Sequence, residues 1–329
     1  MEQDWAISGK LSPDSLTRNI LAFCGARRPE VLIGAAVGED AAVLEWPQGK
    51  LLVFASDPIV GAAENAGRLL VRVNVNDIAS KGGEPAFMVV TLILPPKMGE
   101  SGASRLMREI HEECLTLGIA VVGGHTEFND LYEHPVLMAA ILGTADRVFS
   151  ADSIRPGDEI LITKHVGIEG MSILAADRKD LLSPYLTPDE IAEVISWGEH
   201  TCVLEESRLA REYAKFMHDP TEGGVWGGIA EICGLGSLGV KIRKDSIPID
   251  AITQKAAAEL NFDPLHLIAS GSLLIVVSPE NTASLVSRFE AANISCARIG
   301  YFVDRDGDEI PAQKEELWGL LKKRIAGIK

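Results

Sequence analysis

Apolar and polar positions follow two periods along this chain, and together these periods predict a mixture of strands and helices. Ala86–Leu94 is an almost continuous apolar run that stops at Pro95-Pro96, which is typical of a strand buried on both faces. Residues 100–117 place apolar side chains on one face and charges opposite, which predicts an amphipathic helix. For the first half we expect helices at 15–25, 64–81 and 100–117, and strands at 31–37, 51–56, 86–94, 119–122 and 136–144.

The same mixture continues after residues 146–158, a stretch that loses the apolar pattern and carries a Pro-Gly turn. We therefore predict an α/β (α+β) chain of two related domains, 1–148 and 149–329. A length of 329 residues suits two domains of about 150 each. For the second half we expect strands at 159–163, 240–243, 273–277 and 296–303, helices at 169–180, 188–197, 202–216, 225–233, 250–260 and 280–291, and an amphipathic segment at 313–326.

The segment 64–81 fits both periods, because its valines alternate with polar residues while its apolar residues also recur at helical spacing. Lys81-Gly82-Gly83 is typical of a helix end, so we predict a helix. This choice places Asn76 and Asp77 on the buried stripe. A buried carboxylate is costly unless it is paired or bound to a metal.

Three acids of the first half are candidates for one cation site. Asp57 follows the strand at 51–56 and precedes Pro58, Asp77 lies in the predicted helix, and Asp40 lies in a Gly-Glu-Asp turn. Their positions at strand and loop ends suit a ligand. The alternative is that they are surface turn and capping residues.

Gly123-Gly124-His125-Thr126 follows a predicted buried strand and is a candidate phosphate loop. Two glycines allow backbone N–H groups to approach an anion, and Thr126 adds a hydroxyl. No Gly-Lys-Ser/Thr follows, so this is not a P-loop, and the alternative is a structural turn. His125 is a candidate for metal binding, proton transfer or phosphate contact, or else a plain hydrogen-bonding group.

The string His-Asp-Pro-Thr-Glu-Gly-Gly at 218–224 places an acid, a hydroxyl and glycines just before a predicted helix. That arrangement suits metal or phosphate chemistry. Ordinary helix capping explains Asp219 or Thr221 taken singly, but it explains the whole string less well. Ser270-Gly271-Ser272 either lines a nucleotide pocket or forms a turn, and we favour the turn.

Composition narrows the function classes. The formal net charge is −16 with no basic stripe, which argues against binding to nucleic acid or to an anionic membrane. The apolar runs are too short to span a membrane, and the acidic N-terminus is unlike a signal peptide, so we expect a cytoplasmic protein. Five scattered cysteines form no disulfide or zinc pattern, and no serine- or zinc-hydrolase motif occurs.

Six motifs taken in order resemble the AIR synthase (PurM)-like superfamily, most closely HypE and the AIR-synthase-related proteins grouped with it. The resemblance spans about residues 7–305. The motifs are GEDAAV at 38–43, SD at 56–57, VNDIASKGGEP at 75–85, VGGHTEF at 122–128, HDPTEGG at 218–224 and ASGSLLI at 269–275.

The resemblance implies a two-domain fold whose N-terminal strands form a barrel across a homodimer, with ATP and Mg²⁺ as cofactors. It implies metal ligands at Asp40, Asp57, Asp77 and Asp219, cofactor contacts at Gly38, Asn76, Gly123, Gly124, Thr126, Glu127 and Thr221, and catalytic roles for Asp219, His125 and Glu222. The implied function is ATP- and Mg²⁺-dependent activation of a carbonyl, amide or phosphate oxygen on a small-molecule or protein-borne acceptor.

This chain also departs from its relatives. HypE ends in a cysteine that carries a carbamoyl group, whereas this sequence ends in RIAGIK, so we do not expect carbamoyl dehydration on its own tail. Many family members have an acid where His125 stands. The alternative function is therefore a non-catalytic, nucleotide-binding dimeric scaffold in a maturation complex.

Overall fold

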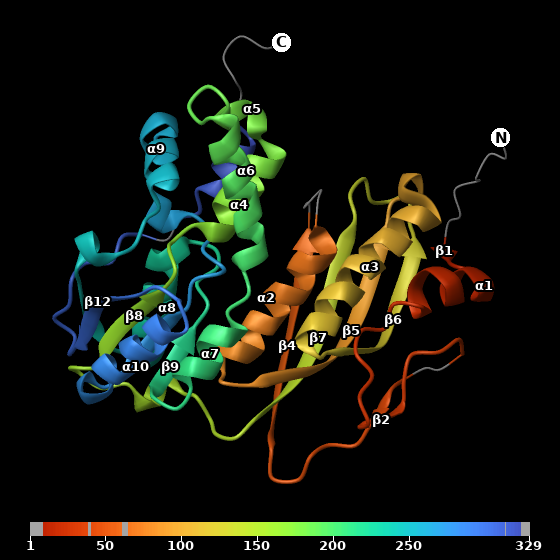
Figure 1. The fold of residues 1–329 in the computed structure, drawn as a ribbon, viewed down its shortest axis with the longest axis horizontal. Helices are drawn as coiled ribbons and strands as arrows, with labels where there is room; N and C mark the ends of the chain where they lie inside the picture. The colour runs from red at the N-terminus through yellow and green to blue at the C-terminus, as the bar shows by residue number, and fades with distance from the viewer. Residues whose placement is uncertain (1–8, 39–40, 61–64, 313, 324–329) are drawn as a thin grey trace. The chain divides into compact units, whose positions relative to one another are not determined.

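The computed structural model describes residues 9–38, 41–60, 65–312 and 314–323. The chain divides into two compact units, one of residues 1–78 and 83–146 and the other of residues 79–82 and 147–329. The main division thus lies two residues before the expected boundary after residue 148. Each unit combines a five-stranded sheet with helices, so the expected mixed two-domain class is confirmed (Figure 1).

The sheet of the first unit has the strand order β1-β6-β5-β7-β4. Only β5 and β6 are parallel, and the other pairs are antiparallel. The register places Asp57, Ala139, Val90 and Gly124 in one row across β4, β7, β5 and β6. Asp57 and Gly124 are therefore three strands, or about 14 Å, apart. The strands are β1 (Gly9–Lys10), β4 (Leu51–Val60), β5 (Glu84–Leu94), β6 (Ala120–Phe128) and β7 (Val136–Ala145).

Helices α2 (Ala66–Ser80) and α3 (Gly99–Leu117) cover one face of this sheet (Figure 1). Successive residues of β5 point to opposite faces of the sheet. Val90, Leu92 and Leu94 are buried on the helix-covered face, whereas Thr91 and Ile93 on the other face are partly exposed. The hairpin of β2 (Val31–Ile33) and β3 (Val43–Leu44) and the segment that follows it cover part of the second face, where they pack against Phe87, Ala120 and Val122.

The second unit has the strand order β10-β12-β8-β11-β9, and every pairing in it is antiparallel. One core packs the sheet against α8, and another joins α4, α6, α9 and α11. The strands are β8 (Glu159–Thr163), β9 (Ala214–His218), β10 (Gly239–Ile242), β11 (Leu274–Val277) and β12 (Cys296–Val303). The helices are α4 (Ile168–Asp177), α5 (Lys179–Leu182), α6 (Pro188–Ser196), α7 (Leu204–Ala210), α8 (Gly224–Gly236), α9 (Ala251–Leu260), α10 (Pro279–Ala291) and α11 (Leu317–Leu321).

Some expected elements need correction. The strand expected at 51–56 continues to Val60, so Asp57 and Pro58 lie inside β4 and not after it. In place of the helix expected at 15–25, the first helix α1 (Pro13–Leu16) is followed by a π-helical turn at Thr17–Leu21.

Three further elements also differ from expectation. The helix expected over 202–216 is wrong in its second half, because α7 ends at Ala210 and β9 begins at Ala214. Pairing with β11 buries Phe216 and Met217, and this tertiary gain overrides helix propensity. The strand expected at 31–37 ends at Ile33. Of the segment expected at 313–326, α11 covers only Leu317–Leu321, and residues 313 and 324–326 lie outside the described residues.

None of the described helices has both the length and the apolar character needed to cross a membrane.

Candidate functional site

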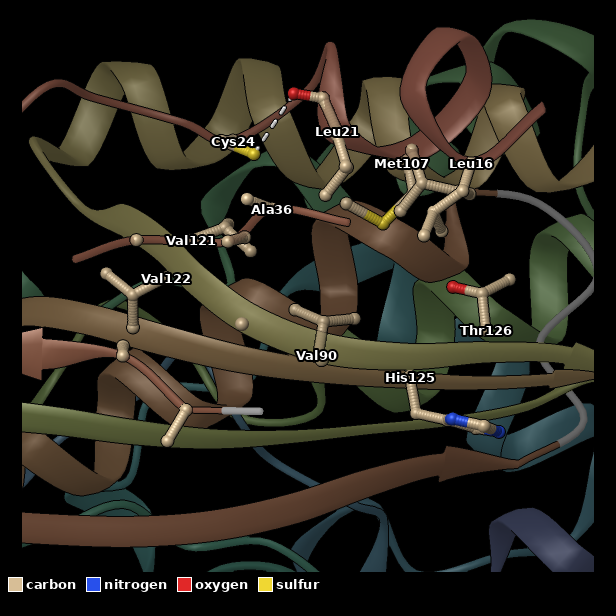
Figure 2. Close-up of a pocket in the computed structure, with 17 residues that line it drawn as sticks. Leu16, Leu21, Cys24, Ala36, Val90, Met107, Val121, Val122, His125 and Thr126 are labelled. Carbon is tan, nitrogen blue, oxygen red and sulfur yellow. Dashed lines mark hydrogen bonds between the residues drawn. The ribbon is translucent and has the colours of Figure 1, made fainter. Parts of the chain in front are cut away.

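A cavity of about 110 Å³ lies along β6 in the first unit (Figure 2). Its lining is mostly apolar, and its polar atoms come from a histidine, a threonine and the backbone of a glycine pair. Concave, largely apolar cavities with a few polar groups are the usual form of small-molecule sites. The lining residues are Leu16, Ile20, Leu21, Cys24, Gly34, Ala35, Ala36, Ala41, Ala42, Val90, Met107, Val121, Val122, Gly123, Gly124, His125 and Thr126.

The cavity follows from incomplete pairing of β6 along its outer edge. Within the described residues, β1 pairs only with Glu127 and Phe128, and the segment after the first helix meets β6 only at Ala120 and Val121. Between these contacts, no strand formed by the described residues covers the edge over 122–126. The side chains of Leu16 and Met107 lie beside this stretch in Figure 2.

The candidate phosphate loop is a strand, which corrects the sequence-based expectation of a turn after residue 122. Met88 pairs with Val121 and Val89 with Gly123, so Val122 is an extra residue that forms a bulge. Gly124 has φ +155°, and a Cβ there would lie 2.0 Å from the carbonyl oxygen of Val90. The close approach of the two parallel strands therefore requires glycine at position 124. Strand packing explains this glycine whether or not the residue also contacts a ligand.

His125 and Thr126 lie on opposite faces of the sheet because they are consecutive residues of a strand. Thr126 is buried on the face that carries α2 and α3, and Figure 2 shows His125 pointing the other way. The Nε2 of His125 lies 3.2 Å from the Oε2 of Glu127, and Asn129 donates to the other oxygen of that carboxylate. The structure therefore groups His125 with Glu127 and separates both from Thr126.

Asp57 is held by the side chain of Asn74 in α2. Asn74 Oδ1 accepts from the N–H of Asp57 at 2.9 Å, and its Nδ2 donates to the carbonyl of Asp57 at 3.1 Å. Asp77 lies three residues after Asn74 and therefore on the same helix face. Asp57 and Asp77 are half-buried, whereas Asn76 is fully buried. The helix thus places Asn76 on the buried stripe, and Asp77 lies at its margin.

The remaining predicted residues are distributed over the chain. Gly38 is exposed with φ +88°, and Asp40 lies outside the described residues. In the second unit, Asp219 is buried directly after β9, followed by half-buried Thr221 and exposed Glu222. The convergence of all four aspartates on one metal stays a prediction.

The turn before α8 depends on its two glycines. Gly223 has φ +84° and Gly224 has φ +63°, and a Cβ at Gly224 would lie 2.5 Å from the carbonyl oxygen of Leu265. The N–H of Gly223 donates to a carboxylate oxygen of Glu315 at 2.7 Å. The motif at 218–224 is therefore a constrained turn that joins a sheet edge to a helix N-terminus.

No three side chains of His, Cys, Asp or Glu among the described residues meet as a group that could hold a metal ion. Mg²⁺ that accompanies a nucleotide needs only one or two protein carboxylates, because phosphate oxygens and water complete its shell. Asp57 and Asp77 fit that role and do not fit a closed protein cage.

Several cavity residues were not predicted from sequence. Cys24 and Met107 line the cavity, and burial raises the pKa of the Cys24 thiol. In the second unit, Glu169 is buried and was not predicted either, whereas buried Ser270 belongs to the Ser270-Gly271-Ser272 string for which we favour a turn. A glutamate inside the apolar run Ile168–Leu174 is the one feature that marks Glu169 in the sequence.

Comparison with known proteins places both halves in one family. Residues 38–145 match the N-terminal domain of AIR synthase related proteins, and residues 155–312 match the C-terminal domain. A hydrogenase expression/formation protein of Methanocaldococcus jannaschii is 27% identical over 257 residues, covering 76% of this chain and 74% of that protein.

Two further comparisons concern HypE proteins. Carbamoyl dehydratase HypE of Rhizobium leguminosarum is 23% identical over 279 residues, covering 82% of this chain and 78% of that protein. A crystal structure of the hydrogenase maturation protein HypE in complex with ATP is similar in fold, with a TM-score of 0.73 and 21% identity, over 88% of this chain and 86% of that one.

Proposed function

Because the chain belongs to the AIR synthase related family, we propose that it is an ATP- and Mg²⁺-dependent enzyme that activates a carbonyl, amide or phosphate oxygen on an acceptor. Support comes from the name of one relative, a carbamoyl dehydratase, and from a fold neighbour solved with ATP. The observation that carries the proposal is the cavity beside the glycine-rich edge of β6.

The cavity combines two kinds of chemistry. Leu16, Leu21 and Met107 provide apolar surface for a nucleobase. Gly123, Gly124 and the hydroxyl of Thr126 provide a side-chain-free edge and a hydrogen-bonding group for phosphates. A nucleotide laid along β6 would meet both kinds of group, because Leu16 and Met107 lie beside Thr126 (Figure 2).

Asp57 and Asp77 are the residues that we assign to Mg²⁺ in this unit, together with Asp40 and Asp219 by family resemblance. Mg²⁺ held by these residues would supply positive charge that offsets the charge of the nucleotide phosphates. Asn74 fixes the backbone of Asp57, so its carboxylate is positioned before the nucleotide arrives. His125 and Glu127 lie on the other sheet face, so we assign them to the acceptor side and not to the phosphates.

We also propose a cytoplasmic homodimer formed through the sheet face opposite α2 and α3. Leu52, Phe54 and Met138 are exposed on β4 and β7 at positions that alternate with covered residues. Their exposed fractions are 56%, 62% and 46%. Large apolar side chains gathered on one sheet face are typical of an interface.

The experiment that tests this function measures Mg·ATP affinity by calorimetry in Asp57→Asn and Asp77→Asn, with Asp130→Asn as a matched control in an exposed loop. Each of the first two variants should weaken Mg·ATP binding about tenfold or more, because one charge-assisted metal contact is lost. Thermal unfolding should stay two-state in all three proteins. Unchanged affinity in both site variants refutes the assignment.

Turnover separates the enzyme from the scaffold. ATP hydrolysis measured with small amides or carbamoyl compounds should be stimulated by one acceptor class and abolished in Asp219→Ala. Tight nucleotide binding without turnover across those acceptors would favour the non-catalytic scaffold.

A further inference from the structure

Three glycine-containing turns of the second unit meet around one buried glutamate, Glu169. Glu169 lies in the first turn of α4, which follows a turn at 164–167; a second turn at 268–272 precedes β11, and a third at 219–223 precedes α8. The N–H of Gly170 donates to the carbonyl of Ile268 at 3.2 Å, which ties the first turn to the second. Glu315 ties the second to the third, because its carboxylate accepts from Ile268 and from Gly223.

Two polar groups at this junction are buried without completing a hydrogen bond. Glu169 is 5% exposed and Ser270 is 0% exposed. The side chain of Ser270 lies within hydrogen-bonding range of the Glu169 carboxylate. Within the described chain, however, neither Oε2 of Glu169 nor Oγ of Ser270 has a hydrogen bond of acceptable geometry. A buried polar group left in this state destabilises the fold. Two such groups side by side indicate a position built to receive a ligand with hydrogen-bond donors.

The charged side chains that act on Glu169 are both acidic. Burial is the main effect that raises the pKa of Glu169 to about 7; Ser270 opposes it, and Glu222 and Glu315 raise it further. Within the described chain, no basic side chain is among the groups that act on this carboxyl. Glu315 already accepts three backbone N–H groups, from Gly223, Ile268 and Leu317, so its role is to hold the turns.

We propose that Glu169 and Ser270 form a second site, which binds the cationic nitrogen of a small primary amine or of ammonium. An ammonium group supplies N–H donors to Oε2 of Glu169 and Oγ of Ser270, and its charge offsets that of the acids. A metal ion is disfavoured, because no three metal-donor side chains of the described residues come together. Burial of both residues selects a small head group over a quaternary one. The residues of this site lie wholly in the second unit, whereas the residues that line the nucleotide cavity lie in the first.

Binding should depend on pH in a defined direction. The protonated, neutral carboxyl of Glu169 attracts a cation less than the ionised form does. The pKa of Glu169 is raised, so amine affinity should increase as pH rises through about 7. Binding should release a proton near neutral pH, because the cation favours the ionised carboxylate.

The test is calorimetric titration of the full-length protein with methylammonium chloride at pH 8 and constant ionic strength. Glu169→Gln should weaken binding at least tenfold, and Ser270→Ala should weaken it about threefold. Glu280→Gln is the matched control, since Glu280 also lies in the first turn of a helix of this unit but is exposed; it should bind like the wild type. Circular dichroism checks that each variant is folded.

Titrations with other cations identify the chemical nature of the ligand. Ammonium chloride should bind, and tetramethylammonium chloride, which lacks N–H donors, should not. Equal methylammonium affinity in wild type and Glu169→Gln overturns the proposal. Binding of K⁺, Mg²⁺ or Ca²⁺ that disappears in Glu169→Gln, without methylammonium binding, overturns the assignment to nitrogen.

Discussion

The side chain of Asn74 acts as a strand partner for Asp57. Its amide accepts from the N–H and donates to the C=O of Asp57, as a neighbouring strand would at the edge strand β4. It also donates to the carbonyl of Leu70, one turn back in α2. One buried amide therefore joins the helix to the edge of the sheet at the position of a proposed metal ligand.

Replacement of Asn74 by alanine should lower the free energy of unfolding by about 2–4 kcal/mol, because this buried side chain loses three hydrogen bonds, one of them fully buried. Mg·ATP affinity should fall as well, since Asp57 loses its anchor. Asn281→Ala is the control, because Asn281 makes one side-chain bond, to Ser278, and should cost less than about 1 kcal/mol. Urea unfolding measures the free energy of unfolding of both variants. Equal losses in the two variants would show that Asn74 has no special role.

A second prediction concerns two ion pairs that join α2 to α3. Arg72 and Glu113 form a buried bidentate pair at 2.8 and 2.9 Å, whereas Arg68 and Glu112 form an exposed pair at 2.7 Å. Glu113→Ala should destabilise the fold by about 3–5 kcal/mol, because it leaves a buried charge. Glu112→Ala should cost less than about 1 kcal/mol. Chemical denaturation of both variants checks this, and similar costs would contradict the account.

The thiol of Cys24 reports on the cavity. Burial raises its pKa, so alkylation by iodoacetamide should be slow at pH 7 and faster as pH rises, since the thiolate reacts. Mg·ATP at ten times its dissociation constant should slow the reaction about tenfold, because only the free protein reacts. Cys202, half-buried in the second unit, serves as the internal control. Mass spectrometry of both cysteines measures the rates, and protection of neither would place the nucleotide elsewhere.

The proposed dimer predicts an effect of Phe54→Asp. A charge on the exposed sheet face should raise the dimer dissociation constant roughly 30-fold or more, equivalent to about 2 kcal/mol. Leu131→Asp is the control, because Leu131 is 83% exposed in the loop after β6. Sedimentation equilibrium measures both variants. If the wild-type protein is monomeric at micromolar concentration, the proposed dimer is wrong.

Much of the fold can be predicted from the sequence where either the helical or the strand period of apolar residues clearly dominates. Apolar spacing and the Lys81-Gly82-Gly83 ending together predict a helix at 64–81, and α2 (Ala66–Ser80) confirms it. The expected helix at 202–216 failed because residues 214–218 gain more from pairing with β11 than from helical bonds. Such a gain depends on a strand about 60 residues away, which local periodicity does not contain.

The candidate site was only partly readable, for a related reason. Gly123-Gly124 has the composition of a turn, yet Gly124 is glycine because β5 approaches it, at Val90. The faces of His125 and Thr126 could not be assigned until the segment was known to be a strand. Cys24 and Met107 reach the cavity through tertiary packing, and no motif marks them. The metal assignments to Asp40 and Asp219 still rest on family resemblance.

The central claim is that a nucleotide binds along the uncovered edge of β6, with its base against Leu16 and Met107 and its phosphates at Gly123–Thr126. A crystal structure with Mg²⁺ and a non-hydrolysable ATP analogue tests this most directly. We predict density for the base in the cavity and for Mg²⁺ within coordination distance of Asp57 or Asp77. Density for the analogue at any other position, with the cavity unchanged, would contradict the account.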